Sequence, residues 1–347
     1  MFGTYRLILA FMVVFLHLGG WPAFGEYAVF TFFCLSGYLM TFIMQENYGY
    51  SAQGRKKYFI NRLLRIYPLY LAACLFSLVV IFCLGEEYTS GLIFNLKYPD
   101  SIISSLSNLF LFISDHKNIA LVPPAWALTV EILYYILIGL GISKTKTGTW
   151  IWFGFGAIYT IGILITNMEW WDWGYFHPFA ASLPFSVGAL LYHYKAQLSL
   201  RFKRFSTIYI AAGLYAFVLI NWAVNYKLGT GLSYGFYINS ALNVILLIIL
   251  TNIQISSKQW HKCDKALGDL SYPIYLMHWT VAIIVMYVFQ SFNIELEKRT
   301  ELFALVSLPF MLLFGQIIVS LLHKPVEKLR NHIKNDKQAS ITGNQNI

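Results

Sequence analysis

The chain has 347 residues, of which 58% are hydrophobic and only 12% charged, whereas a soluble domain carries about 25% charged residues. This composition excludes an ordinary soluble enzyme, and apolar runs recur from end to end, so the sequence predicts an all-α, polytopic membrane protein. The net charge of +9 comes from basic residues spread over several connecting segments. They form no single patch, so we do not expect nucleic-acid binding.

Ten apolar segments can be drawn as candidate membrane spans. They lie at residues 3–20, 27–44, 66–84, 124–142, 150–166, 179–194, 207–224, 236–253, 273–291 and 301–322. The run 102–113 is too short and too rich in Ser and Asn to cross alone, so an interfacial or re-entrant helix is expected there. The first segment is interrupted by His17 and followed by no clear cleavage site, which favours an uncleaved helix over a signal peptide.

The distribution of basic residues indicates how these segments are oriented. With the N-terminus in the cytoplasm, all but five of the 25 Lys and Arg residues fall on the cytoplasmic side. Cytoplasmic segments of membrane proteins carry such an excess, which favours ten spans with both termini inside. We expect one transmembrane domain over 1–332 and a polar, disordered tail over 333–347.

The first segment, "RLILAFMVVFLH", carries Arg6 near the cytoplasmic end and His17 deep in the outer half. Eleven residues of helix separate them by about 16 Å and return them to nearly the same face. Taken singly, Arg6 is typical of a flanking residue that reaches the interface, and His17 of a packing residue. Their shared face favours a joint function, because ionisable side chains inside a membrane are costly.

The second segment contains "FFCLSGYLM", in which Ser36 and Gly37 permit close helix packing or place a hydroxyl near the depth of His17. In the basic loop that follows, Arg62 and Arg65 are three residues apart. They therefore share a helical face that suits a phosphate-bearing ligand at the membrane surface. Ordinary cytoplasmic anchoring is the equal alternative.

The fourth and ninth segments add further polar groups. Glu131, in "PPAWALTVEILYY", lies about 10 Å inside the membrane and needs a partner, for which His17 is at comparable depth. A Glu131–His17 pair would orient the imidazole as a general base requires. His278 falls in the cytoplasmic half of the ninth segment and suits packing or function equally. The tryptophan-rich loop 167–178 favours an interfacial anchor over a sugar-stacking platform.

These residues together resemble the acyltransferase-3 family of bacterial integral membrane acyltransferases. The resemblance covers nearly the whole chain, in order, through six motifs: Arg6-x10-His17, "FFCLSG" 32–37, "RLLRIYP" 62–68, "WALTVE" 126–131, "LSYPIYLMHW" 270–279 and "HKPVEKL" 323–329. Ala127 and Leu7 depart from residues common in the family, but neither carries the proposed chemistry. The extracellular esterase-like domain of some members is not seen, so we expect the chain to deliver the acyl group itself.

The resemblance implies an O-acetyltransferase of polysaccharide or lipopolysaccharide biosynthesis in the bacterial inner membrane. Its partners would be acyl-CoA, usually acetyl-CoA as co-substrate, a carbohydrate hydroxyl on a surface or lipid-linked glycan, and membrane lipid. Neither a permanently bound cofactor nor a metal is expected. The assigned roles are: catalytic, His17, Glu131 and Ser36; acyl-CoA-binding, Arg6, Arg62, Arg65 and Tyr67; supporting, Gly37, Trp126 and His278.

Several alternatives stay open from the sequence. His17 would serve as general base in direct transfer, with Ser36 or His278 stabilising the oxyanion. A covalent acyl-Ser36 or acyl-His17 relay is the competing mechanism. A polytopic transporter or flippase for a glycan or small molecule shares the same intramembrane polar residues, although the internal repeat typical of transporters is not visible. An unrelated membrane acyltransferase fold is disfavoured by the ordered motifs.

Overall fold

The computed structural model describes residues 2–113, 118–253 and 257–332, and these parts of the chain contain helices and connections but no strand. The longer helices are α1 (Phe2–His17), α2 (Phe24–Ile43), α3 (Ala52–Leu84), α6 (Trp126–Leu140), α7 (Lys146–Thr166), α8 (Ser182–His193), α10 (Ile208–Leu228), α11 (Tyr234–Asn252), α12 (Lys258–Ser291) and α13 (Glu301–Ile318). The expected tail over 333–347 lies outside the described residues.

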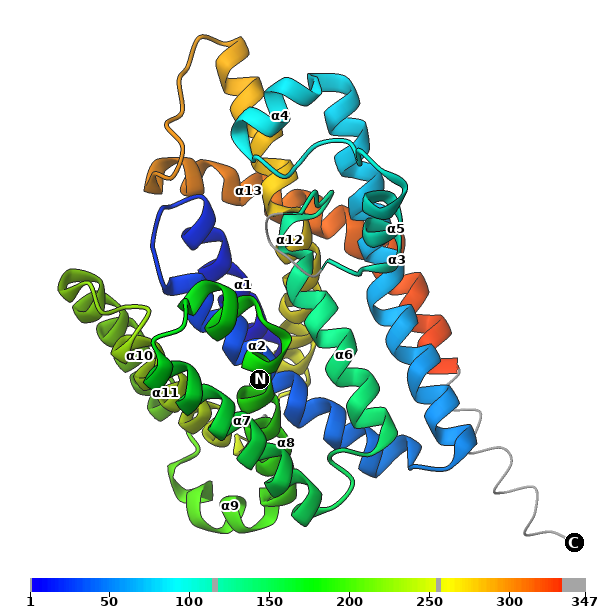
Figure 1. Cartoon of the computed structure of the whole chain (residues 1–347), viewed down its shortest axis with the longest axis vertical. Helices are drawn as coiled ribbons and strands as arrows, with labels where there is room; N and C mark the ends of the chain where they lie inside the picture. Colours follow the sequence, from blue (N-terminus) through cyan, green and yellow to red (C-terminus); the bar gives the residue numbers. More distant parts are fainter. Residues whose placement is uncertain (1, 114–117, 254–256, 333–347) are drawn as a thin grey trace, which may run out of the picture.

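Short helices connect these elements. They are η1 (Met44–Tyr48), α4 (Glu86–Leu92), α5 (Ile102–Phe110), η2 (Pro123–Ala125), η3 (Trp170–Phe176), η4 (Pro178–Ala181), α9 (Lys195–Phe202), η5 (Lys203–Phe205) and η6 (Val319–His323). Figure 1 shows α4 and the α12–α13 connection at one end of the molecule, and α9 with the start of α3 at the opposite end. The run 102–113 contains only the nine-residue α5.

Eight of the helices in the described ranges are long and apolar enough to cross a membrane. The chain is therefore an all-helical, multi-pass membrane protein, as the composition predicts. The other two expected spans correspond to the 16-residue α1 and the 12-residue α8, which are shorter. The count of ten spans and the cytoplasmic placement of the termini stay predictions.

Two helices begin earlier than the sequence predicts. The basic stretch expected to be a loop before Pro68 is instead the first part of α3, which starts at Ala52. Ser51 caps this helix, because its Oγ accepts a hydrogen bond from Gly54 N at 3.1 Å. The ninth segment likewise begins at Lys258 and not at 273. The predicted spans were bounded by polar residues. The helices extend through these residues because Lys, Arg and Gln are good helix formers.

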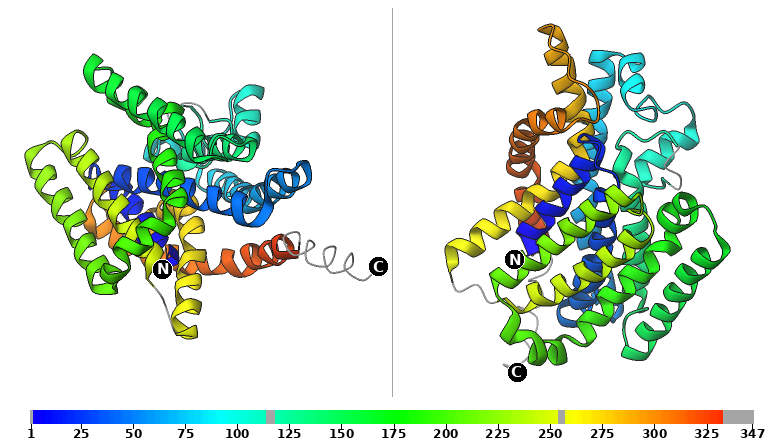
Figure 2. Two further views of the ribbon diagram at one scale, coloured as in Figure 1. Left: turned by 90° about the horizontal axis from the view of Figure 1, so that it is seen from below. Right: turned by 90° about the vertical axis from the view of Figure 1, so that its left-hand side faces the viewer.

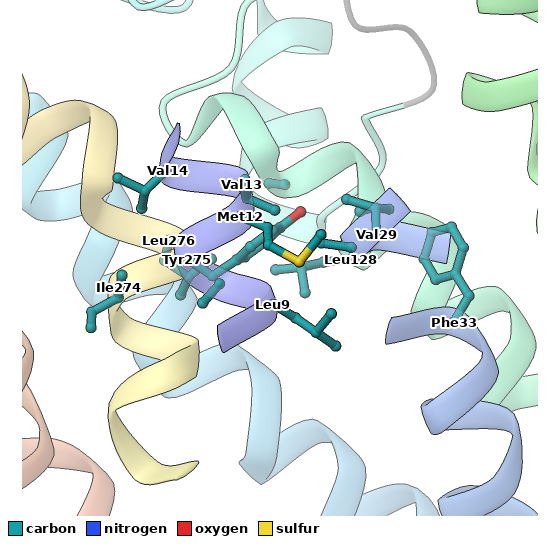
Figure 3. Packing of buried hydrophobic residues seen from close by; sticks show 14 of the residues in the cluster. Leu9, Met12, Val13, Val14, Val29, Phe33, Leu128, Ile274, Tyr275 and Leu276 are labelled. Atoms are coloured by element: carbon teal, nitrogen blue, oxygen red, sulfur yellow. The ribbon is translucent and has the colours of Figure 1, made fainter. Parts of the chain in front are cut away.

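Helices α1 and α2 lie in the middle of the bundle, with other helices around them (Figures 1 and 2). Side chains from four helices meet there, among them Leu9 of α1, Phe33 of α2, Leu128 of α6 and Leu276 of α12 (Figure 3). All four side chains are buried. This packing fixes α1 against α12 and so determines which part of the interior each polar residue of α1 faces.

Glycine allows α2 and α8 to approach closely. A Cβ atom on Gly37 would lie 2.1 Å from the backbone O of Phe185, and one on Gly188 would lie 1.9 Å from the backbone O of Cys34. Small residues at such crossings let backbones touch, which is a main source of helix association in membranes. The structure therefore gives Gly37 the packing role that the sequence left as one alternative.

We expect Gly188→Ala to destabilise the bundle, because the added methyl group must push α8 away from α2. Overpacking of this kind costs about 1–3 kcal/mol, so the thermal unfolding midpoint of the detergent-solubilised protein should fall by several degrees. Gly162→Ala is the matched control, since a Cβ there meets no atom within 4 Å. An unchanged midpoint for Gly188→Ala would contradict the close crossing.

Candidate active site

Two cavities contain nearly all the intramembrane polar residues singled out from the sequence. The first, of about 380 Å³, is called the basic cavity. Its charged lining residues are Arg6, Arg62, Arg65, Lys265, Arg330, Glu131, Asp269 and Glu327. The second, of about 510 Å³, is called the histidine cavity, and its lining includes His17, Trp126, Phe176, Trp279, Lys298 and Arg299. Arg6 and His17 therefore open on different cavities from the two ends of α1.

The three arginines predicted from the sequence meet a fourth, Arg330, in the basic cavity. Asn61 holds two of them together: its Oδ1 accepts from Arg62 Nη2 at 2.7 Å and from Arg330 Nη2 at 3.1 Å. Asn61 Nδ2 also donates to the backbone O of Arg330 at 3.3 Å, which fastens the C-terminal helix to α3. Sequence analysis missed Arg330 and Asn61, although the motif "HKPVEKL" ends one residue before Arg330.

An ion-pair network supports Arg65 at the mouth of the basic cavity. Arg65 Nη1 lies 2.7 Å from His323 Nε2, and the guanidinium can only donate, so Nε2 accepts. Lys265 Nζ lies 3.3 Å from the Asp269 carboxylate and 2.7 Å from that of Glu327. Ligand atoms of Asp269, His323 and Glu327 lie within 4.8 Å of one another. These residues would hold a metal ion only if Lys265 released both carboxylates.

Some guanidinium donors in the basic cavity have nothing to bind. The Nε atoms of Arg6 and Arg62 are buried and have no hydrogen-bonding partner in the part of the chain that the structure describes. Buried donors normally find an acceptor, because an unmet hydrogen bond costs free energy. A guanidinium fork matches phosphate oxygens in two-point contact. The cavity therefore has the chemistry of a polyanion site.

Glu131 faces the basic cavity and not His17. Its Oε1 accepts a hydrogen bond from Ser36 Oγ at 2.6 Å and another from the Tyr135 hydroxyl. The expected Glu131–His17 pair is wrong, since among the described residues Glu131 is bonded only to these hydroxyls. Ser36 is likewise placed away from His17. The reason is that α6 packs with Glu131 towards α2 at the level of Arg62, beyond the reach of the far end of α1.

The imidazole of His17 is in contact with two other rings, those of His278 and Trp279. Its imidazole stacks on His278, with centroids 5.3 Å apart and planes at 13°, and lies 5.0 Å from the Trp279 ring. His278 Nδ1 lies 2.8 Å from the backbone O of Tyr275, so Nδ1 carries the proton, because a carbonyl only accepts. The buried Nε2 of His278 has no partner among the described residues. None of the described residues that line this cavity is Asp or Glu, so no described carboxylate orients His17 there.

The stacked pair corrects the predicted depth of His278. The sequence placed it in the cytoplasmic half of a span beginning at 273, with His17 in the outer half. Because α12 begins at Lys258, His278 lies well along the helix and level with His17. His278 is fully buried and stacks on His17, which gives it a packing role, and its supporting role in the site stays a prediction.

Tyr275 separates the two cavities. Its ring lines the basic cavity, and its hydroxyl donates to the backbone O of Pro124 at 2.9 Å, which lines the histidine cavity. The ring of Phe32 packs edge-on against it, with centroids 6.2 Å apart. A ligand that extends from Arg6 to His17 must pass beside these two rings.

Of the two remaining predicted residues, Trp126 lies at a cavity and Tyr67 does not lie where it was expected. Trp126 lines the histidine cavity and packs edge-on against Phe176 at 4.6 Å, as expected of a residue near the site. Tyr67 lies elsewhere: its hydroxyl donates to the backbone O of Phe110 at 2.8 Å, and it is not among the residues that line the basic cavity. Tyr67 thus ties α3 to α5.

Comparison with known proteins agrees with this architecture. A family model for acyltransferase-3 proteins, described as an acyltransferase domain, matches residues 4–323, nearly the whole chain. No curated protein and no solved structure matches the chain. Arg330 lies beyond the matched range, so its place in the basic cavity comes from the structure alone.

We expect Asn61→Leu to release the helical residues 324–332 from α3, because leucine has similar size but makes none of the hydrogen bonds to Arg330. Trypsin must take the Arg330 side chain into its own pocket, so cleavage after Arg330 should rise by about fivefold, the equivalent of about 1 kcal/mol for a hydrogen bond. Mass spectrometry of the released peptide measures this. Cleavage after the exposed Arg204 is the internal control, and equal cleavage at Arg330 in both proteins would refute the clamp.

Proposed function

The chain belongs to the acyltransferase-3 family, and on this premise we propose that it is an O-acyltransferase of the bacterial cytoplasmic membrane. It moves an acyl group, acetyl in the simplest case, from cytoplasmic acyl-CoA to a hydroxyl of a cell-surface or lipid-linked carbohydrate. One observation carries the proposal: α1 reaches from Arg6 in a cavity of converging arginines to His17 in a separate cavity.

The basic cavity is the proposed site of the donor. Coenzyme A carries phosphate groups at one end and its thioester at the end of a long flexible arm. Arg62 and Arg330, paired by Asn61, with Arg6 and Arg65 beside them, offer the planar donors that phosphates prefer. The fold itself brings these four arginines to the lining of one cavity.

The length of α1 fits the arm of the donor. The eleven helical steps from Arg6 to His17 rise by about 16 Å in an α-helix. A phosphate group held at Arg6 would place the thioester near His17 once the arm passes Tyr275 and Phe32. The partition between the cavities then limits the access of water to the thioester.

The chemistry proposed at His17 is general-base catalysis. A neutral imidazole takes the proton of the acceptor hydroxyl while the oxygen attacks the thioester carbonyl carbon. The tetrahedral intermediate collapses with cleavage of the C–S bond, and the leaving thiolate takes the proton from His17. An ester and free coenzyme A result, and His17 returns to its neutral form. His278 and Trp279 hold the imidazole in place by stacking on it.

The contact between Ser36 and Glu131 supports a covalent route as the second mechanism. Glu131 would take the proton from Ser36 Oγ, which lies 2.6 Å away, while Oγ attacks the thioester carbon and the thiolate leaves as the thiol. The acceptor hydroxyl, activated by His17, would then attack acyl-Ser36. Direct transfer needs fewer steps and no movement of an acylated serine between cavities, so it is the route we propose.

His17→Ala should abolish transfer of radiolabel from acetyl-CoA to the host's surface glycans in membranes containing the protein. Loss of a general base lowers the rate by about 10²–10⁴-fold. Normal transfer would remove His17 from the mechanism. Glycan export that depends on the protein, with no transfer, would favour a transporter.

His177→Ala is the matched control for the loss of an imidazole. His177 follows η3 and stacks on Trp173 at 5.1 Å, outside both cavities. Partial burial lowers the pKa of its imidazole, so it is also a neutral histidine at pH 7. The control should transfer label at the wild-type rate.

Incubation with acetyl-CoA in the absence of acceptor separates the two routes. Direct transfer predicts no acetylated peptide containing Ser36, and Ser36→Ala should retain activity within about tenfold, since it removes one hydrogen bond. Peptide mass spectrometry gives the answer. An acetyl group on Ser36 that forms within one turnover and disappears when acceptor is added would establish the covalent route instead.

A further inference from the structure

The histidine cavity has an unusual charge for its position. Two cationic residues, Lys298 and Arg299, are among its lining residues, and none of its lining residues in the described ranges is Asp or Glu. Exposed carboxylates occur in the elements that supply part of this lining: Glu86 and Glu87 in α4, and Glu295 and Glu297 in the α12–α13 connection. None of these four is among the lining residues, whereas the two cations are.

The backbone at Arg299 is held in a strained conformation. Its φ is +58°, a left-handed value that residues with a side chain seldom adopt. Its carbonyl packs against Gly20, in the turn after α1: a Cβ on Gly20 would lie 2.6 Å from Arg299 O. Gly20 itself has φ +69°. Arg299 is therefore fixed on the turn that follows His17, so its place relative to His17 is set by backbone contact.

The two cations differ in what they already bind. Lys298 Nζ donates to the backbone O of Gly91 at 2.9 Å, which holds the α12–α13 connection to α4. The exposed guanidinium of Arg299 has no hydrogen bond or ion pair with any residue that the structure describes. The backbone of Arg299 is thus fixed beside the turn after α1, and its guanidinium has five free donors for a ligand.

We propose that the histidine cavity selects an anionic acceptor, a sugar that carries a carboxylate or phosphate close to the hydroxyl that is acylated. Arg299 binds the anion in two-point contact, while Trp126, Trp279 and Phe176 offer aromatic faces to the sugar ring. The inference rests on the proposed function in one respect only: it takes the histidine cavity as the entrance of the acceptor.

Selectivity is expected because Arg299 forms stronger hydrogen bonds with an anionic ligand than with a neutral one. A hydrogen bond between ions is about twice as strong as one between neutral groups. An uncharged sugar would supply no counter-charge to the Arg299 guanidinium, and none of the described residues lining the cavity is a carboxylate that could do so. The interaction should also weaken with salt, because Arg299 is exposed and ions in solution screen it.

Three probes that share one pyranose ring test the inference. They are methyl α-D-glucopyranoside, the corresponding methyl glucuronoside and the corresponding 6-phosphate, which differ only in the group at C6. Binding is measured by saturation-transfer NMR on the full chain in phosphatidylcholine nanodiscs, with no acyl donor present. We expect the charged probes to bind about tenfold more tightly than the neutral one, and 0.5 M NaCl to remove the difference.

Variants identify the residue responsible. Arg299→Gln should lower the affinity for the charged probes to that for the neutral probe. Arg299→Lys should keep part of the preference for the charged probes. Arg299→Gly also removes the charge, but glycine adopts φ +58° without strain. If both variants lose the preference for charged probes, backbone strain at residue 299 is not the cause. Lys227→Gln, which removes an exposed cation at the end of α10 and away from the cavity, should bind like the wild type.

Each outcome decides the inference. Preference for the glucuronoside alone assigns a carboxylate, and preference for the phosphate alone assigns a phosphorylated sugar. Equal binding of all three probes, no binding of any, or a preference that survives Arg299→Gln and Arg299→Gly overturns it. Charged probes that bind in a protein unable to transfer acetyl groups would leave the anion site standing while the proposed function fails.

Discussion

Asp264 of α12 caps the start of α1 from a distant part of the chain. Its carboxylate accepts from Gly3 N at 3.1 Å, from Thr4 N at 2.9 Å and from Thr4 Oγ1 at 2.8 Å. The first backbone N–H groups of a helix have no partner within it, and the positive end of the helix dipole favours a carboxylate there. This contact fixes α1 along α12, so Arg6 opens on one cavity and His17 stacks on His278.

The basic cavity shows how charge is managed inside this bundle. Several cations that would repel one another are kept together by neutral and acidic partners: Asn61 between two guanidiniums, His323 against Arg65, and two carboxylates on Lys265. Buried cations are tolerated when their hydrogen bonds are met or when a ligand supplies the counter-charge. Among the described residues of this cavity, the buried Nε groups of Arg6 and Arg62 stay without an acceptor, and they lie where we propose that the anionic acyl donor binds.

Much of the site was readable from the sequence because its strongest signal is local. Ionisable residues in apolar segments are costly, so Arg6, His17, Glu131 and His278 stood out without a structure. Ser36 stood out as a hydroxyl near the expected depth of His17, and Arg62 and Arg65 as a pair of cations on one helical face. The family model confirms the resemblance that their order suggested. The predicted Glu131–His17 pair was wrong because the depth of each residue in the membrane was inferred from where its apolar segment begins. Since α12 continues through a polar stretch to Lys258, His278 and not Glu131 reached the level of His17.

The sequence by itself determined the class of the protein, its helical segments and the residues that a membrane would not tolerate without a function, because composition and spacing act within single helices. Only the tertiary structure decided which of these residues meet. It separated them into two cavities, joined Glu131 to Ser36, and brought Arg330 across 269 positions to Asn61, which also binds Arg62. It also placed Arg299 beside the turn after His17. Such contacts depend on how helices far apart in the chain pack, and no local pattern encodes that.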